Sequence, residues 1–127
     1  MNINNFAICT GRLTADPVFF THRDGSRTCR FTVAASNAFK SSDGSRGSQF
    51  IPLEAFVPAD TKGSVYDLLK KGMLVSVEYD VRNNNYVDKK TGEQKFEITL
   101  FCDIVRIQES KAATEARMSA GEGETED

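Results

Sequence analysis

The sequence has only three cysteines, one histidine and no tryptophan, and it has no long apolar run. The cysteines at positions 9, 29 and 102 are odd in number, lie far apart and form no C-x-x-C pair, so we expect no disulfide framework and a reducing cytoplasm. No apolar run approaches the ~20 residues that cross a bilayer, and the N-terminus lacks a signal-peptide pattern. With 127 residues, the chain has room for a single folded domain. From these scarcities we expect neither a membrane protein nor a secreted protein.

Residues that carry catalysis or bind metals are equally scarce. His22 lies beside Arg23 and Asp24 in an expected turn, where a surface residue is expected rather than a general base. One histidine and scattered cysteines give no zinc-ligand spacing, and neither a phosphate-binding loop motif nor a nucleophilic serine motif occurs. The sequence therefore predicts a protein that is not an enzyme and that uses no metal or cofactor.

Charge is unevenly distributed along the chain, whose formal net charge is −2. Residues 1–108 carry 14 Lys and Arg against 12 Asp and Glu, whereas residues 109–127 carry 2 against 6. Met118 is the only sizeable apolar side chain of the last segment, which therefore cannot bury enough surface to offset the entropy of ordering it. We expect a mildly basic folded domain over residues 1–108 and a disordered acidic tail over residues 109–127. The alternative is a short frayed helix within residues 109–118, where alanines favour helix.

Alternation of apolar and polar residues dominates the domain and indicates strands with one buried face. The expected strands cover residues 5–13 with a continuation at 18–21, then 30–36, 49–57, 75–82 and 95–102. The apolar stripe Val65, Leu68 and Leu69, which ends before Gly72, predicts a helix between the third and fourth strands. This is the element order of the OB-fold, an all-β, five-stranded Greek-key barrel with the helix between strands 3 and 4. A small β-sandwich is the alternative, but it would not require a helix there.

Aromatic residues lie on the polar face of the strand over residues 49–57. Phe50 and Phe56 share that face with Glu54, which indicates that the face is exposed to water. Tyr86 is in phase with Arg82 rather than with the valine stripe of its strand, so it should also point outward. Further cations lie on the long loops, among them Lys40, Arg46, Lys89, Lys90 and Lys95.

Exposed rings beside cations suit single-stranded nucleic acid, because unpaired bases stack on flat rings while phosphates attract cations. The pattern alone leaves open a second interpretation, in which a second sheet or a neighbouring subunit covers Phe50 and Phe56. Phe39 is in phase with the core residues Phe31 and Val33, so alternation alone places it in the core, whereas a bend of the chain after Ser36-Asn37 would turn it outward.

Four segments resemble bacterial and phage single-stranded DNA-binding proteins, in the same order and with matching gaps. They are GRLTADP at 11–17, RFTVAAS at 30–36, LKKG at 69–72 and VSVE at 75–78. The resemblance runs over about residues 4–107. It implies an OB-fold that binds and protects single-stranded DNA, whatever its sequence, during replication, recombination and repair. It also implies a homotetramer in which the first strand pairs between subunits.

The resemblance extends to individual positions. Family members carry aromatic residues at the positions of Phe39, Phe50, Phe56 and Tyr86, which assigns Phe39 a stacking role against the alternation. The family's phosphate-binding cations match Lys40, Lys71 and Arg82, and also Lys62, whose segment is about two residues longer than usual. With the loop cations, the expected DNA-binding set is Phe39, Lys40, Arg46, Phe50, Phe56, Lys62, Lys71, Arg82, Tyr86 and Lys89.

Two features depart from the family's pattern. The chain has no tryptophan, and phenylalanine stacks over less area, so we expect weaker binding per base. The acidic ending Glu126-Asp127 lacks the apolar tip by which family members recruit replication and repair proteins, which favours a phage, plasmid or paralogous version. Other binding roles on the same barrel stay open: a primosomal accessory protein, a single-stranded RNA binder, or a protein-interaction module.

Overall fold

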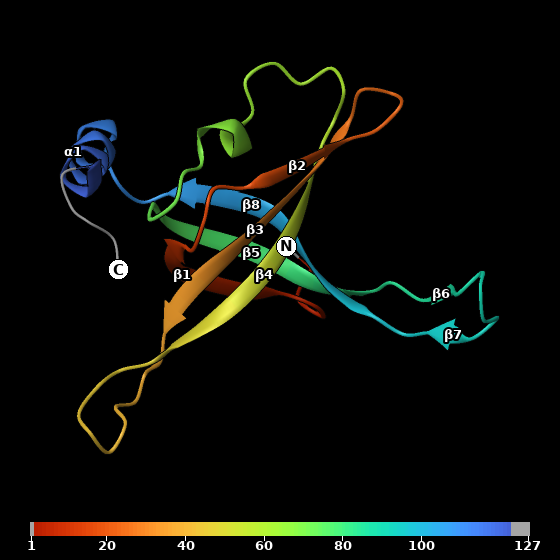
Figure 1. Ribbon diagram of the computed structural model, residues 1–127, viewed down its shortest axis with the longest axis horizontal. Coiled ribbons are helices and arrows are strands. Elements are labelled where there is room, and N and C mark those ends of the chain that lie inside the picture. The colour runs from red at the N-terminus through yellow and green to blue at the C-terminus, as the bar shows by residue number, and fades with distance from the viewer. Residues whose placement is uncertain (1, 123–127) are drawn as a thin grey trace.

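The computed structural model describes residues 2–122. In it, six strands pair into one sheet that curls and closes on itself (Figure 1). The strand order is β1-β5-β8-β4-β3-β2, and an additional pairing of β1 with β3 closes the barrel. The strands are β1 (Ala7–Leu13), β2 (Val18–Thr21), β3 (Arg27–Ser36), β4 (Ser48–Val57), β5 (Leu74–Asn83) and β8 (Ile98–Ile107). Because β1 and β2 form one interrupted strand, the prediction of a five-stranded barrel consistent with the OB-fold is confirmed, and the structure adds that this barrel is closed.

The barrel closes where β1 passes from β5 to β3. β1 pairs with β5 over most of its length, while its last two residues, Arg12 and Leu13, also pair with β3. A Cβ atom at Gly11 would lie 2.1 Å from the carbonyl oxygen of Ala34, so only glycine allows this close approach of two backbones. After Pro17 the chain continues as β2 along the other half of β3.

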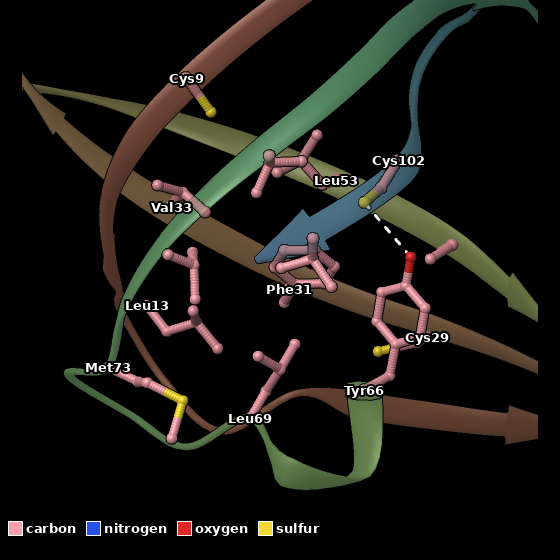
Figure 2. Packing of buried hydrophobic residues seen from close by; sticks show 14 of the residues in the cluster. Cys9, Leu13, Cys29, Phe31, Val33, Leu53, Tyr66, Leu69, Met73 and Cys102 are labelled. Carbon is pink, nitrogen blue, oxygen red and sulfur yellow. Dashed lines mark hydrogen bonds between the residues drawn. The ribbon is translucent and has the colours of Figure 1, made fainter. Parts of the chain in front are cut away.

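The interior is filled from the faces that alternation assigned to the core. Val33, Val75 and Val77 are fully buried, and Phe31 lies with its ring centroid 6.2 Å from that of Tyr66. Figure 2 shows Tyr66 and its neighbours Leu69 and Met73, from the segment before β5, closing one end of this core.

The three cysteines belong to the same core and are free thiols. The Tyr66 hydroxyl lies 3.4 Å from the Cys102 sulfur, as the dashed line in Figure 2 marks. Burial raises the pKa of Cys29 to about 12 and that of Cys102 to about 11. Both thiols therefore stay protonated at neutral pH and pack as small apolar side chains.

The prediction of a helix between the third and fourth strands is wrong. Between β4 and β5 the chain makes a single 3₁₀ turn, η1 (Val65–Leu68), in which Ser64 Oγ accepts a 3.2 Å hydrogen bond from the Tyr66 amide. Leu68 is exposed while Leu69 is buried, so the apolar stripe does not form one helix face. The turn lies between Gly63 and Gly72, whose φ angles of 70° and 83° break the helical path on both sides.

The α-helix of the molecule, α1 (Lys111–Glu122), lies instead at the C-terminal end, in the segment expected to be disordered. The alanines and Glu115 favour helix, and Glu109 attaches the helix to the barrel through Thr114 and Arg117. Glu109 also accepts a hydrogen bond from the Leu74 amide of β5, a contact between distant segments that composition does not reveal. Residues 123–127, which include the acidic ending without an apolar tip, lie outside the described residues.

β5 and β8 extend past the barrel as an arm, which ends in the short hairpin β6 (Tyr86–Val87) and β7 (Gln94–Lys95) (Figure 1). The inward stripe expected for these strands is therefore wrong at its outer end, where Val81, Phe96 and Ile98 are exposed. The pairing register shifts between Glu78 and Tyr79. No second sheet faces the described arm, so alternation there does not separate a buried face from a wet one.

Candidate nucleic-acid interface

A groove of about 570 Å³ runs between the outer face of β3 and β4 and the base of the β5–β8 arm. Arg30 and Thr32 of β3 and Pro52 and Glu54 of β4 line one side of it. β8 supplies the other side with Ile98, Thr99 and Leu100. Residues on alternate positions of β3 and β4 face the core, so Arg30, Thr32, Pro52 and Glu54 face the groove, while the core residues Phe31 and Leu53 also contribute to its lining.

The four aromatic residues expected to stack on bases are all exposed. Phe50 and Phe56 lie on the outer side of β4, opposite Ala34 and Thr28 of β3. Phe39 is 66% exposed in the loop between β3 and β4, so the core position that alternation assigned to it is wrong. The bend of the chain after Ser36 breaks the period of two there. That these rings contact bases stays a prediction.

Sequence reasoning missed two further rings on the same side of the sheet. Phe20 of β2 is 45% exposed and lies opposite Thr28, which in turn lies opposite Phe56. Phe101 of β8 pairs with Glu54. Alternation within Val18–Thr21 was a usable signal for Phe20, because its neighbour Phe19 packs against the core.

The predicted cations surround the barrel rather than forming one patch. Lys40 and Arg46 lie in the β3–β4 loop with Phe39, near Phe50 at the start of β4. Lys62 and Lys71 lie on either side of η1. Arg82 and Lys89 lie on the arm, as does the predicted ring Tyr86. Figure 1 shows the arm and the β3–β4 loop at different ends of the molecule. A ligand that meets all of them has to be long and follow the surface.

Most of the predicted cations are available to an anion. Within residues 2–122, Lys40, Lys62, Lys71 and Lys89 form no ion pair with a carboxylate. Arg46 is engaged differently, because its guanidinium donates to the carbonyl oxygens of Asn37 and Ala38 at 3.1 and 2.9 Å and so supports the loop.

Two polar groups of the arm are held in place by carboxylates. Arg82 Nε lies 2.7 Å from Asp80 Oδ1, and its guanidinium lies 3.9 Å from the centroid of the Phe101 ring. The hydrogen bond to Asp80 raises the pKa of Arg82. The Tyr86 hydroxyl donates to Glu97 Oε1 at 3.1 Å, which raises the pKa of the phenol. Arg82 therefore stays charged, and both side chains are oriented before any ligand arrives.

Within the described part of the chain, no group of three or more His, Cys, Asp or Glu side chains is arranged to hold a metal ion. No helix there is long and apolar enough to cross a bilayer. The arrangement offers stacking surfaces, cations and hydrogen-bond donors.

Comparison with known proteins agrees with this geometry. The model of the Single-strand binding protein family matches residues 3–108, which is the barrel with its arm and without α1. The chain is 31% identical over 108 residues to "Single-stranded DNA-binding protein 3" of Listeria innocua, covering 84% of this chain and 65% of that protein. It is 29% identical over 106 residues to "Single-stranded DNA-binding protein 2" of Clostridium acetobutylicum, covering 83% and 77%. For "Single-stranded DNA-binding protein A" of Bacillus subtilis the identity is 28% over 107 residues, covering 84% and 60%. The chain thus spans about two thirds of the length of these relatives.

Proposed function

The chain belongs to the single-strand binding protein family, and from this premise we propose that it binds and protects single-stranded DNA without regard to sequence, during replication, recombination and repair. Bases would stack on the exposed rings, and the unpaired lysines would contact phosphates. The observation that carries the proposal is the exposure of Phe39, Phe50, Phe56 and Tyr86 on a surface that also carries lysines without a carboxylate partner.

The same features favour a single strand over a duplex. A duplex hides the faces of its bases in the stack, so exposed rings gain little from it. The rings and lysines also lie on several sides of the barrel, and a flexible strand can follow such a path whereas a stiff duplex cannot.

We also propose that the protein is a homotetramer in which β1 pairs between subunits. In support, β1 has one free edge from Ala7 to Gly11, because only Arg12 and Leu13 pair with β3. Ile8, which is 60% exposed, pairs with Glu78, which pairs in turn with the exposed Ile104, so two exposed isoleucines lie on either side of Glu78 on the outer side of β1, β5 and β8. An open edge beside exposed apolar side chains is a surface that a second copy can cover.

Light scattering tests the assembly. Ile8→Arg places a charge on the proposed contact, and we expect it to lower the measured mass of the particle while the far-UV spectrum stays that of a folded barrel. An unchanged mass contradicts the use of β1 as a contact. Leu68→Ala removes an exposed apolar side chain of η1 and serves as the control.

We place the protein in the cytoplasm of a bacterial cell or of a phage-infected host, which fits its three free thiols. Replication or repair proteins are candidate partners of its C-terminal segment.

Titration with a fluorescent thymidine oligomer tests the main proposal. The association constant should rise as salt falls, with a slope of about −0.7 in log K against log salt for each phosphate neutralised. A duplex of the same length should bind far more weakly. Absence of binding at low salt, or equal binding of duplex and single strand, contradicts the proposal.

A further inference from the structure

Two phenylalanines form a row across three strands on the groove side of the sheet. Phe20 of β2 lies opposite Thr28 of β3, and Thr28 lies opposite Phe56 of β4, so the three side chains point the same way. Strands in a sheet are ~4.8 Å apart, which places the two phenylalanine positions about 10 Å from each other. Phe56 is 51% exposed, and Phe20 is exposed to a similar degree. Phe20 therefore extends the ring surface of Phe56 toward the edge of the sheet.

Each phenylalanine of β2 is covered by an arginine of β3, but on opposite faces of the sheet. The Arg27 guanidinium lies over Phe19 and the Arg30 guanidinium lies over Phe20, each with its carbon atom 4.8 Å from the ring centroid. Adjacent residues of a strand point to opposite faces, so one pair faces the core side and the other faces the groove.

The two arginines differ in how firmly they are held. Arg27 binds Asp67 of η1 through two hydrogen bonds of 2.8 and 2.9 Å, above a ring that packs against the core. On the groove side, Arg30 reaches Glu54 only at 3.5 Å, and the Arg30 side chain is 61% exposed. Exposed ion pairs of this kind contribute little stability in water, so another anion can replace Glu54.

We propose that Phe20 is an additional base-stacking ring of the groove and that Arg30 is its exchangeable cover, held over the ring by Glu54 until a phosphate takes Arg30 away. This inference rests on the proposed binding of single-stranded DNA. Arg30 and Glu54 both line the groove, so a strand that lies on Phe56 brings phosphates to Arg30. A guanidinium binds phosphate with two parallel hydrogen bonds, whereas its contact with Glu54 is long.

Glu54 is then a positioning residue: it holds Arg30 over the Phe20 ring and thereby opposes the binding of DNA. The carboxylate of Glu54 offsets part of the charge of Arg30, and it has to give up the guanidinium before Arg30 can neutralise a phosphate. Removing the carboxylate charge should therefore both tighten binding and add one neutralised phosphate to the complex. A merely structural role of Glu54 would not change the salt dependence.

The test measures the affinity of the full chain for a fluorescent thymidine oligomer over a range of salt. We expect Phe20→Ala to weaken binding about tenfold, as loss of one stacked base does. We expect Glu54→Gln to tighten binding about threefold at low salt and to steepen the slope of log K against log salt by about 0.7. Far-UV spectra and thermal unfolding verify that each variant is folded.

Two matched variants control for general effects. Asp67→Asn removes the same charge from the corresponding pair on the other face, and Leu68→Ala shortens an exposed apolar side chain outside the groove; both should bind as the unchanged chain does. The inference is overturned if Phe20→Ala binds normally, if Glu54→Gln alters neither affinity nor slope, or if Asp67→Asn reproduces the effect of Glu54→Gln. Failure of the unchanged chain to bind the oligomer would instead overturn the proposed function, so the two failures are distinguishable.

Discussion

Arginine and glutamate meet both in the groove and at the junction of α1 with the barrel, yet the two pairs differ in burial. In the groove, the side chains of Arg30 and Glu54 are 61% and 28% exposed. At the junction, the Arg117 and Glu109 side chains are 31% and 8% exposed. In an ion pair exposed to water, another anion can easily take the place of the carboxylate. If a buried ion pair loses one member, the other member is left as a buried charge without a partner. Burial, not residue type, therefore distinguishes an exchangeable arginine–glutamate pair from one that stabilises the fold.

The junction satisfies Glu109 almost completely. Its carboxylate accepts hydrogen bonds from the Leu74 amide at 2.6 Å and from the Thr114 hydroxyl at 2.8 Å, and it also binds the Arg117 guanidinium. Arg12 approaches it to 3.6 Å. Burial by itself would raise the pKa of Glu109, but these donors outweigh burial and lower the pKa to about 2. Glu109 thus joins β5, the end of β8 and α1 at one point.

Substitution of the exposed rings should change DNA binding most. Phe56→Ala and Tyr86→Ala should each weaken binding of a thymidine oligomer about tenfold or more, because each removes a stacking surface. Both side chains are exposed, so the midpoint of thermal unfolding should shift little. Oligomers of other base compositions should lose affinity to the same degree. Normal binding by both variants would show that the rings are not the contact surface.

Substitution at the junction of α1 with the barrel should change stability rather than binding. Glu109→Gln should lower the free energy of unfolding by about 2 kcal/mol, because it leaves the buried side of Arg117 without its charged acceptor. Oligomer binding should change less than twofold. Urea denaturation measures the first quantity, with Glu54→Gln as the control that leaves unfolding nearly unchanged. If the two substitutions destabilise equally, the contrast between the two pairs is wrong.

The pH dependence of the unfolding free energy provides a second test of the role of Glu109. The pKa of Glu109 is about 2 in the folded chain against an ordinary 4.5, so the carboxylate favours folding above pH 4.5, and this contribution is lost as the pH falls toward 2. The difference in unfolding free energy between the unchanged chain and Glu109→Gln should therefore be constant near neutrality and shrink below pH 4.5. A difference that stays constant down to pH 2.5 would contradict the lowered pKa.

The smallest effect concerns the acidic segment. Truncation after Ser110 removes a net charge of −3, since residues 111–127 hold two cations and five carboxylates. Affinity for the oligomer should rise about twofold at low salt, and the two proteins should bind alike at high salt, where charges are screened. Equal or weaker binding of the truncated chain at low salt would exclude competition between the tail and DNA.

Local alternation predicted the inner faces well where a second layer covers the strand. Val75 and Val77 are buried as expected, but Phe96 and Ile98 lie on the arm, which projects beyond the core (Figure 1), and are exposed. The outward positions of Phe50 and Phe56 followed from Glu54 between them. Phe39 required the family resemblance, since a loop has no fixed period.

By itself, the sequence determined most of the strands of the barrel and the outward direction of the rings on β4. These depend on residues close together in the chain, where the period of two and turn residues act directly. Only the tertiary structure decided that Phe20 joins the row of Phe56, that Arg30 covers it, and that Glu109 is buried beneath α1. Those arrangements arise from pairing and packing between segments far apart in the chain, which no local pattern encodes.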